Sequence, residues 1–131
     1  FPFLKRLGRA LKKTGKPLQL HVCGDTTDRL DTFVQAGFDI LCLDTKVDFA
    51  VAREKVGDSV CLMGNVCPNT TLLFGSPEDV ERDSKKVIKQ AGRNSNLILS
   101  SGCMLSPDTP KDNIRAMVNA AKTFGRYPIS D

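Results

Sequence analysis

The residues of this sequence best suited to chemistry are its single histidine, His21, and two of its five cysteines, Cys23 and Cys103. His21 and Cys23 lie two positions apart in a strand-like run, so both side chains would point to the same side. Cys103 follows a later strand-like run and would lie at the same level of a parallel sheet. A His/Cys/Cys set can bind Zn²⁺ and leaves a fourth position open, as in catalytic zinc sites. Free cysteine is also common as a small buried residue, so the residues alone leave both interpretations open.

Polar residues also follow the other predicted strands. Asp44 ends the second strand, Asn65 follows the third, and Ser101 comes after the fourth. Ligands of α/β proteins bind at the carboxyl ends of the strands, so we expect these three residues to contact substrate. Asp44 is equally consistent with capping its own turn, and Asn65 with fixing its own loop.

The remaining cysteines differ in their surroundings. Cys42 and Cys61 lie within apolar strands and are expected to be packing residues, whereas Cys67 lies at a strand end and is a reserve metal ligand. An odd number of cysteines in or just after apolar runs favours thiol or metal chemistry over disulfides. We therefore expect a protein of the reducing cytoplasm.

The hydrophobic periodicity predicts one helix followed by four strand–helix units. The first helix has Phe3, Leu4, Leu7 and Leu11 at helical spacing and ends at Gly15. The predicted strands are residues 17–22, 38–43, 60–63 and 97–99.

Each later helix has an expected start, and most have an expected buried face or end. The second helix is expected to start at Thr26 or Thr27, to bury Leu30, Phe33 and Val34 and to end at Gly37, and the third to start at Asp48, to bury Phe49, Ala52 and Val56 and to end at Gly57. The fourth helix is expected to run from the cap Ser76 to Gly92. The fifth is expected to start at Thr109 and to bury Ile114, Met117, Val118 and Ala121. The start at Ser76 is the strongest, because Pro77 suits a first turn and Asp79 favours the positive end of the helix dipole.

Apolar strands that alternate with helices predict a parallel sheet, as in an α/β barrel or a doubly wound fold. No Gly-x-Gly-x-x-Gly follows the first strand, which disfavours a dinucleotide-binding fold. A closed (β/α)₈ TIM-barrel takes eight strands and roughly 250 residues. We therefore expect residues 1–131 to form a single domain whose four βα units would make a half barrel, and a doubly wound sheet stays open as the other interpretation of these residues.

The composition excludes several classes of protein. The net charge is only +4, and there is no Trp and one Tyr, so we expect no nucleic-acid partner. No apolar run approaches the roughly 18 residues needed to span a bilayer, so we expect no membrane association. The sequence begins at Phe1 and not at Met, so we expect it to belong to something longer.

Several motifs resemble the uroporphyrinogen decarboxylase superfamily over nearly the whole chain. They are His21-Val22-Cys23-Gly24, Gly64-Asn65-Val66 with Pro68, residues 75–80, Ser101-Gly102-Cys103, Thr109-Pro110 and Asn113-Ile114. The resemblance implies the carboxyl-terminal half of a uroporphyrinogen decarboxylase-like TIM barrel. The partner that completes it would be the amino-terminal half or a second copy in a homo-oligomer.

Within that superfamily the chain is most similar to the methylcobamide:coenzyme M methyltransferases. This resemblance implies a zinc ion bound by His21, Cys23 and Cys103, and methyl transfer from methylcobalamin or another methyl-corrinoid to a thiol such as coenzyme M. It also implies a role in methanogenesis. No corrinoid-binding Asp-x-His-x-x-Gly pattern is present, so the corrinoid is expected on a separate corrinoid protein.

Other interpretations stay open. Uroporphyrinogen decarboxylases, which decarboxylate tetrapyrrole carboxylates, need no metal and lack this thiol pair. A non-catalytic zinc-binding half barrel is a further alternative. Cobalamin-independent methionine synthase uses a comparable zinc set, but Met104 and Leu105 follow Cys103 where that family has Cys-Gly-Leu-Lys.

Overall fold

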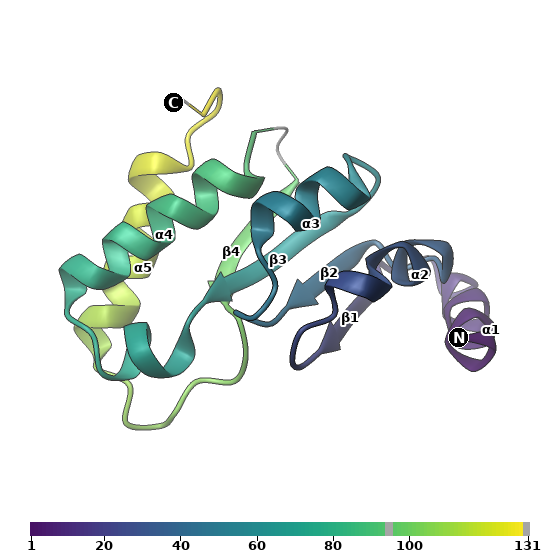
Figure 1. Cartoon of the computed structure of the whole chain (residues 1–131), viewed down its shortest axis with the longest axis horizontal. Coiled ribbons are helices and arrows are strands. Elements are labelled where there is room, and N and C mark those ends of the chain that lie inside the picture. Colours follow the sequence, from purple (N-terminus) through teal and green to yellow (C-terminus); the bar gives the residue numbers. More distant parts are fainter. Residues whose placement is uncertain (94–95, 130–131) are drawn as a thin grey trace.

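The computed structural model describes residues 1–93 and 96–129 and contains one helix followed by four strand–helix units (Figure 1). This order confirms the predicted succession of elements. The strands are β1 Gln19–Val22, β2 Ile40–Leu43, β3 Cys61–Val66 and β4 Leu97–Ser101. The helices are α1 Pro2–Lys12, α2 Leu30–Gln35, α3 Phe49–Val56, α4 Pro77–Ala91 and α5 Lys111–Phe124, with a 3₁₀ turn, η1 Thr27–Arg29, and a π-helical turn, η2 Pro68–Leu73.

The four strands form one parallel sheet in the order β1-β2-β3-β4. Each strand therefore pairs with its neighbour in sequence, and each crossover runs through a helix. This arrangement is that of a partial (β/α)₈ barrel, as predicted. The carboxyl ends of all four strands lie at one edge of the sheet, where His21 ends up near the residues that follow β4.

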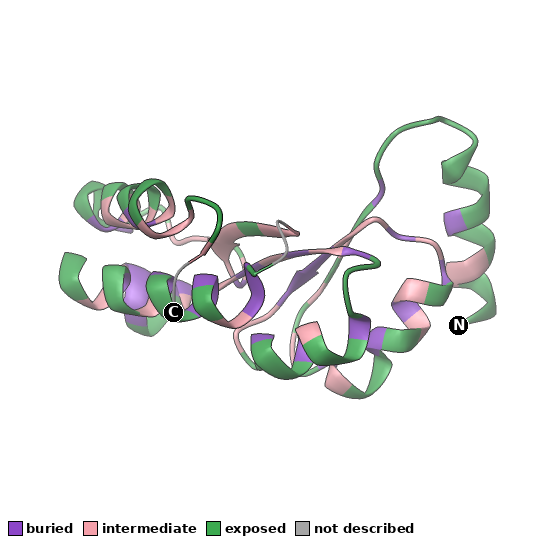
Figure 2. Cartoon of the chain, turned by 90° about the horizontal axis from the view of Figure 1, so that it is seen from above, coloured by how far each residue is buried: buried purple, intermediate pink, exposed green. Residues whose placement is uncertain are grey.

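The core lies between the sheet and its helices. Figure 2 shows the helices along one side of the sheet, with α1 and α5 at the two ends of the row. Leu41, Leu43, Leu62 and Val66 point to this side and are buried, together with Phe49 and the other members of one apolar cluster. The alternation of inward and outward residues along β3 follows from the two-residue period of a strand.

Two of the predicted helix caps are confirmed. Asp48 accepts hydrogen bonds from the backbone N–H groups of Ala50 and Val51 at 2.7 and 3.2 Å. Ser76 and Asp79 form a capping box, in which each side chain accepts from the backbone N–H of the other. These hydrogen bonds satisfy helix N–H groups that have no partner within the helix.

Thr26 occupies the cap position of η1, but neither it nor Thr27 makes the predicted capping hydrogen bond, and the cap position of α2 itself is Arg29. The carboxylate of Asp25 accepts both the backbone N–H of Thr27, at 3.0 Å, and its hydroxyl, at 2.7 Å. Thr26 is buried, and its hydroxyl has no hydrogen-bond partner among the described residues. A charged acceptor one residue upstream therefore takes the role that the sequence suggested for a threonine hydroxyl, and the chain enters α2 through η1.

The start and the buried face of α5 also differ from prediction. Pro110 occupies the cap position, and the buried hydroxyl of Thr109 makes no hydrogen bond in the described part of the chain. Asn113 points inward and donates to the backbone carbonyls of Leu72 and Gly75. The fully buried residues of α5 are thus Asn113 and Ala120; of the predicted face, Met117 packs partly buried against the core and Val118 is 45% exposed.

Two strands extend further than predicted. β3 runs to Val66 and β4 to Ser101, because Asn65 and Val66 find pairing partners in Ser100 and Ser101. The residues Gly64 and Asn65 therefore belong to a strand and not to the loop after it. The π-helical turn η2 that follows was not expected from the sequence.

The opposite side of the sheet is covered by no helix among the described residues. His21, Cys42, Met63 and Ile98 are in register across the four strands and point to this open face. Ile98, near the start of β4, is 43% exposed there. An apolar strand face of this kind belongs to the inside of a barrel, where other side chains would cover it.

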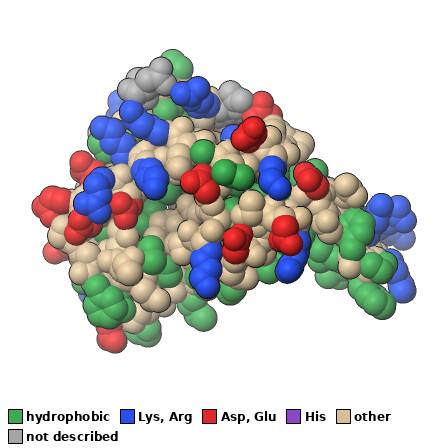
Figure 3. All heavy atoms as spheres, in the orientation of Figure 1, with side chains coloured by type: hydrophobic (Ala, Val, Ile, Leu, Met, Phe, Trp, Pro, Cys, Tyr) green, Lys and Arg blue, Asp and Glu red, His purple; other side chains and the backbone are tan. Residues whose placement is uncertain are grey.

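Helix α1 packs at one end of the row and leaves apolar residues exposed. Gly8 lies against the carbonyl oxygen of Ala36, where a side chain would not fit. Phe3 and Leu7 are 78% and 51% exposed, and Figure 3 shows hydrophobic side chains gathered over this helix. Within residues 1–93 and 96–129, no helix is long and apolar enough to cross a membrane.

We expect the isolated 131-residue chain to associate in solution, because its open sheet face and the free edges of β1 and β4 promote pairing. Light scattering during size-exclusion chromatography should show dimers or larger species. Ile98→Lys, on the open face, should shift the population towards monomer. Val51→Lys on α3, where the native side chain is 38% exposed, is the matched control and should not. A monodisperse wild-type monomer would contradict this expectation.

Candidate metal centre

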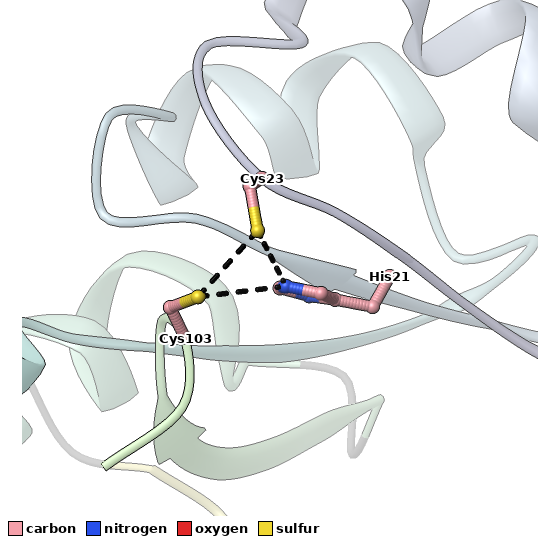
Figure 4. A group of neighbouring side chains, drawn as sticks. All are labelled: His21, Cys23 and Cys103. Carbon is pink, nitrogen blue, oxygen red and sulfur yellow. Dashed lines mark hydrogen bonds between the residues drawn. The ribbon is translucent and has the colours of Figure 1, made fainter. Parts of the chain in front are cut away.

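Three potential metal ligands, from the two outer strands of the sheet and the loops after them, converge where the strands end (Figure 4). His21 lies on β1, Cys23 follows it, and Cys103 follows β4 at the opposite edge of the sheet. The Nε2 atom of His21 is 3.3 Å from the Sγ of Cys23 and 3.8 Å from the Sγ of Cys103. The two sulfur atoms are 3.5 Å apart. The structure thus brings together the three residues that the sequence suggested as a metal set.

These separations fit the ligand shell of a zinc ion. With Zn–N near 2.0 Å and Zn–S near 2.3 Å, tetrahedral coordination places N and S about 3.5 Å apart and two S atoms about 3.8 Å apart. The ligand atoms observed lie within 4.8 Å of one another, so little movement is needed to enclose an ion. His21 and Cys23 are exposed and Cys103 is half-buried, which leaves access for a fourth ligand.

The backbone of β2 orients the imidazole of His21. Its Nδ1 lies 3.0 Å from the carbonyl oxygen of Cys42, which can only accept a hydrogen bond. Nδ1 must therefore carry a proton in this contact, which leaves Nε2 as the nitrogen that faces the two sulfur atoms and could bind a metal. Hydrogen bonding of the second ring nitrogen to a backbone carbonyl is typical of histidines that bind metals.

The neighbouring Cys103 affects the ionisation of the Cys23 thiol. The hydrogen bond with Cys103, followed by repulsion from its charge, raises the pKa of the Cys23 thiol above its usual value. Two thiolates 3.5 Å apart repel each other, so a bound cation would favour the doubly ionised state. The chemistry of the donor set thus also suits a divalent metal.

Asp44 and Asn65 lie beside this cluster, but in the structure both side chains hold backbone. The Asp44 carboxylate accepts from the N–H groups of Gly24 and Lys46 at 2.9 and 3.1 Å. Burial alone would raise the pKa of Asp44, but these hydrogen bonds and that of Thr45 outweigh it and lower the pKa. Asn65 donates to the carbonyl oxygens of Asp44 and Val47. These contacts agree with the turn-capping and loop-fixing roles, while substrate contact stays a prediction.

Ser101 supports the loop that carries the third ligand. Its hydroxyl donates to the carbonyl oxygen of Cys103 at 2.7 Å. Thr45, which sequence reasoning did not single out, lies against Gly102, which it named only within the Ser101-Gly102-Cys103 motif; a Cβ on Gly102 would be 2.6 Å from Thr45 Cγ2. The only sequence signal for this contact is that Gly102 directly precedes Cys103.

The other cysteines lie outside the cluster. Cys42 is buried in β2, and Cys61 is half-buried in β3. Burial raises the pKa of both thiols, which agrees with packing roles. Cys67 is half-buried beyond the end of β3, and it does not belong to the group of possible metal ligands that His21, Cys23 and Cys103 form among the described residues. Burial opposes ionisation of Cys67, but hydrogen bonds from Thr70 and neighbouring backbone lower its pKa.

Comparison with known proteins identifies similar sequences along nearly the whole chain. A family model described as uroporphyrinogen decarboxylase (URO-D) matches residues 1–124. The methylcobamide:CoM methyltransferase MtbA of Methanosarcina mazei is 36% identical over 126 residues, which are 96% of this chain and 35% of that protein. The uroporphyrinogen decarboxylase of Trichodesmium erythraeum is 33% identical over 123 residues, which are 92% of this chain and 34% of that protein.

A solved structure has the same fold. A methyltransferase from Methanosarcina mazei superposes with a TM-score of 0.81 at 26% identity, over 94% of this chain and 35% of that one. The chain therefore spans about a third of the length of the proteins that it resembles. The four βα units of this chain correspond to part of that larger structure.

We expect the natural gene product carrying this sequence to bind about one Zn²⁺ per chain, because three ligands of suitable chemistry already lie together. Elemental analysis of protein purified without chelator should detect it. Cys103→Ser should lower the zinc content sharply, whereas Cys67→Ser, which removes a thiol at another strand end, should leave it unchanged. Equal zinc in wild type and Cys103→Ser would exclude Cys103 as a ligand.

Proposed function

Because the chain belongs to the uroporphyrinogen decarboxylase family, we propose that it is part of a zinc-dependent methyltransferase of that family. The enzyme moves a methyl group from a methyl-corrinoid to a thiol such as coenzyme M. The observation that supports this proposal best is the cluster of His21, Cys23 and Cys103, with ligand atoms within 4.8 Å of one another. The similarity to the two methylcobamide:CoM methyltransferases of Methanosarcina, at 36% and 34% identity, points the same way.

The residues present suit activation of a sulfur nucleophile. Zn²⁺ held by His21, Cys23 and Cys103 would lower the pKa of a thiol at the fourth position, so that the thiol is ionised near neutral pH. Two thiolate ligands leave such a site electron-rich, which favours a nucleophilic sulfur over an acidic water. In the overall reaction a sulfur–carbon bond forms, the cobalt–carbon bond breaks, and its electron pair stays on cobalt.

The protein's own groups would orient the reactants. The Cys42 carbonyl holds the His21 ring in one orientation, and Asp44 holds the backbone next to Cys23. We propose that the substrate approaches from the open side of the strand ends, where His21 and Cys23 are exposed. Direct contact of Asp44, Asn65 or Ser101 with substrate would use the oxygen lone pairs that their present hydrogen bonds leave free.

The proposal includes the partners of the reaction. The corrinoid would arrive on a separate protein and the thiol would be a small diffusible molecule, both within the cytoplasm. The chain itself would be the carboxyl-terminal half of the barrel, with the open sheet face closed by the remaining strands. All three proposed zinc ligands lie on this chain, but one wall of the substrate pocket would come from elsewhere.

Decarboxylation of tetrapyrrole carboxylates is the second candidate, because uroporphyrinogen decarboxylases are 30–34% identical to this chain. That reaction gives no reason for two thiols and an imidazole to lie together at the strand ends. The thiol cluster therefore favours methyl transfer.

The test is to incubate the natural gene product with methylcobalamin and coenzyme M and to follow the corrinoid absorbance. We expect demethylation that requires both thiol and zinc, and that Cys103→Ser lowers by at least an order of magnitude, since loss of a ligand weakens metal binding. Cys61→Ser is the control and should retain activity. Release of carbon dioxide from uroporphyrinogen without any thiol, together with no demethylation, would favour the decarboxylase instead.

A further inference from the structure

The turn formed by Asp44 and Thr45 at the end of β2 contacts both loops that carry the cysteines of the metal centre. It lies between the two edges of the sheet, with β1 on one side and β3 and β4 on the other. Cys23 lies in the loop after β1 and Cys103 in the loop after β4, and the turn contacts both of these loops. Any movement of this turn would therefore change the position of both sulfur atoms.

On one side, the turn holds the backbone next to Cys23. The Oδ2 atom of Asp44 accepts the N–H of Gly24 at 2.9 Å, immediately after the cysteine. Gly24 has a φ of +86°, a left-handed conformation that turns the chain away from β1 and favours glycine. The hydrogen bond to Asp44 fixes this turn and, with it, the direction of the Cys23 side chain.

On the other side, the turn packs against the backbone next to Cys103. A Cβ on Gly102 would lie 2.6 Å from Thr45 Cγ2, 2.7 Å from the backbone nitrogen of Thr45 and 3.2 Å from the carbonyl oxygen of Asn65. Gly102 also donates its N–H to the carbonyl oxygen of Val66 at 2.8 Å. The absence of a side chain is thus what allows the Cys103 loop to approach the turn.

The turn is itself held in place. Its carbonyl at Asp44 accepts from the N–H of Val47 at 3.0 Å and from the amide of Asn65 at 3.2 Å. The same amide donates to the carbonyl of Val47 at 2.7 Å, and Thr45 donates its hydroxyl to Asp44. Asn65 therefore ties the turn after β2 to β3 and makes it a rigid support.

We propose that Thr45 and Gly102 are positioning residues of the metal centre, and that the contact between them sets the separation of Cys23 and Cys103. The inference rests on the metal site proposed above. Thr45 acts through the loop of Cys103, and Asp44 acts through Gly24 on the loop of Cys23. The geometry of the zinc ligands therefore depends in part on Asp44 and Thr45, which belong to neither cysteine loop.

Metal affinity in the natural gene product tests this contact, with zinc measured by chelator competition and ligand geometry by the absorption of bound Co²⁺. Gly102→Ala forces the loop of Cys103 away from Thr45 while every metal ligand and every charge is kept. We expect zinc affinity to fall roughly 10- to 100-fold, the range found when residues that support metal ligands are changed. The Co²⁺ spectrum should change as well.

Thr45→Ser supplies the matched variant, because it removes Cγ2 and keeps the hydroxyl that donates to Asp44. Alone it should bind zinc nearly as wild type. Combined with Gly102→Ala it should restore part of the lost affinity, since the clash with the methyl group is removed and that with the backbone nitrogen remains. This non-additivity would identify a direct coupling between the two residues.

Gly75→Ala is the control for a general steric disturbance, since its Cβ would lie 2.5 Å from the carbonyl oxygen of Thr71, away from the cluster. It should leave the zinc affinity of folded protein unchanged. Equal affinity in wild type and Gly102→Ala, or simple additivity in the double variant, would overturn the positioning role and leave the metal site intact. A wild-type protein that binds no zinc would overturn both the proposed metal site and this inference.

Discussion

The candidate metal centre depends on bringing together loops that follow the two edge strands of a four-stranded sheet. Neighbouring strands are about 4.8 Å apart, so β1 and β4 would be roughly 14 Å apart in a flat sheet. The sulfur atoms of Cys23 and Cys103 are nevertheless 3.5 Å apart. Both cysteine loops contact the turn after β2. Gly24 donates a hydrogen bond to Asp44, and Gly102 approaches Thr45 closely. The parallel sheet supplies the common edge, and the loops supply the convergence.

The chemistry of the cluster follows from this crowding. Two thiols in contact resist losing both protons, and the raised pKa of Cys23 reflects that resistance. A divalent cation changes the balance, because it compensates both negative charges at once. The hydrogen bond from His21 to the Cys42 carbonyl leaves Nε2 as the third donor. Without a cation, the arrangement thus disfavours the ionised form of Cys23. Its three donor atoms are well suited to bind a divalent metal ion.

The two faces of the sheet in this half barrel differ in how they are covered. The helix side of the sheet has a continuous buried core, from Leu30 on α2 to Val80 on α4. The other side exposes a row of strand residues that includes Ile98. The proteins that this chain resembles are about three times as long, so their additional residues are available to cover such a face. All three candidate metal ligands lie on this chain, whereas one face of its sheet is left uncovered in the part that the structure describes.

The sequence by itself determined the features that depend on neighbouring residues. The succession of helices and strands, the caps at Asp48 and Ser76, and the common direction of His21 and Cys23 all follow from local periodicity and hydrogen bonding. The tertiary structure decided what depends on distant residues. Asp25 took the place of the threonines as the hydrogen-bond acceptor before α2, and hydrogen bonds to the carbonyls of Leu72 and Gly75 made Asn113 a buried residue of α5. The approach of Cys103 to Cys23, across 80 residues of sequence, was likewise decided by packing. No spacing along the chain encodes that distance, because it depends on how the Cys103 loop passes Thr45 at the end of another strand.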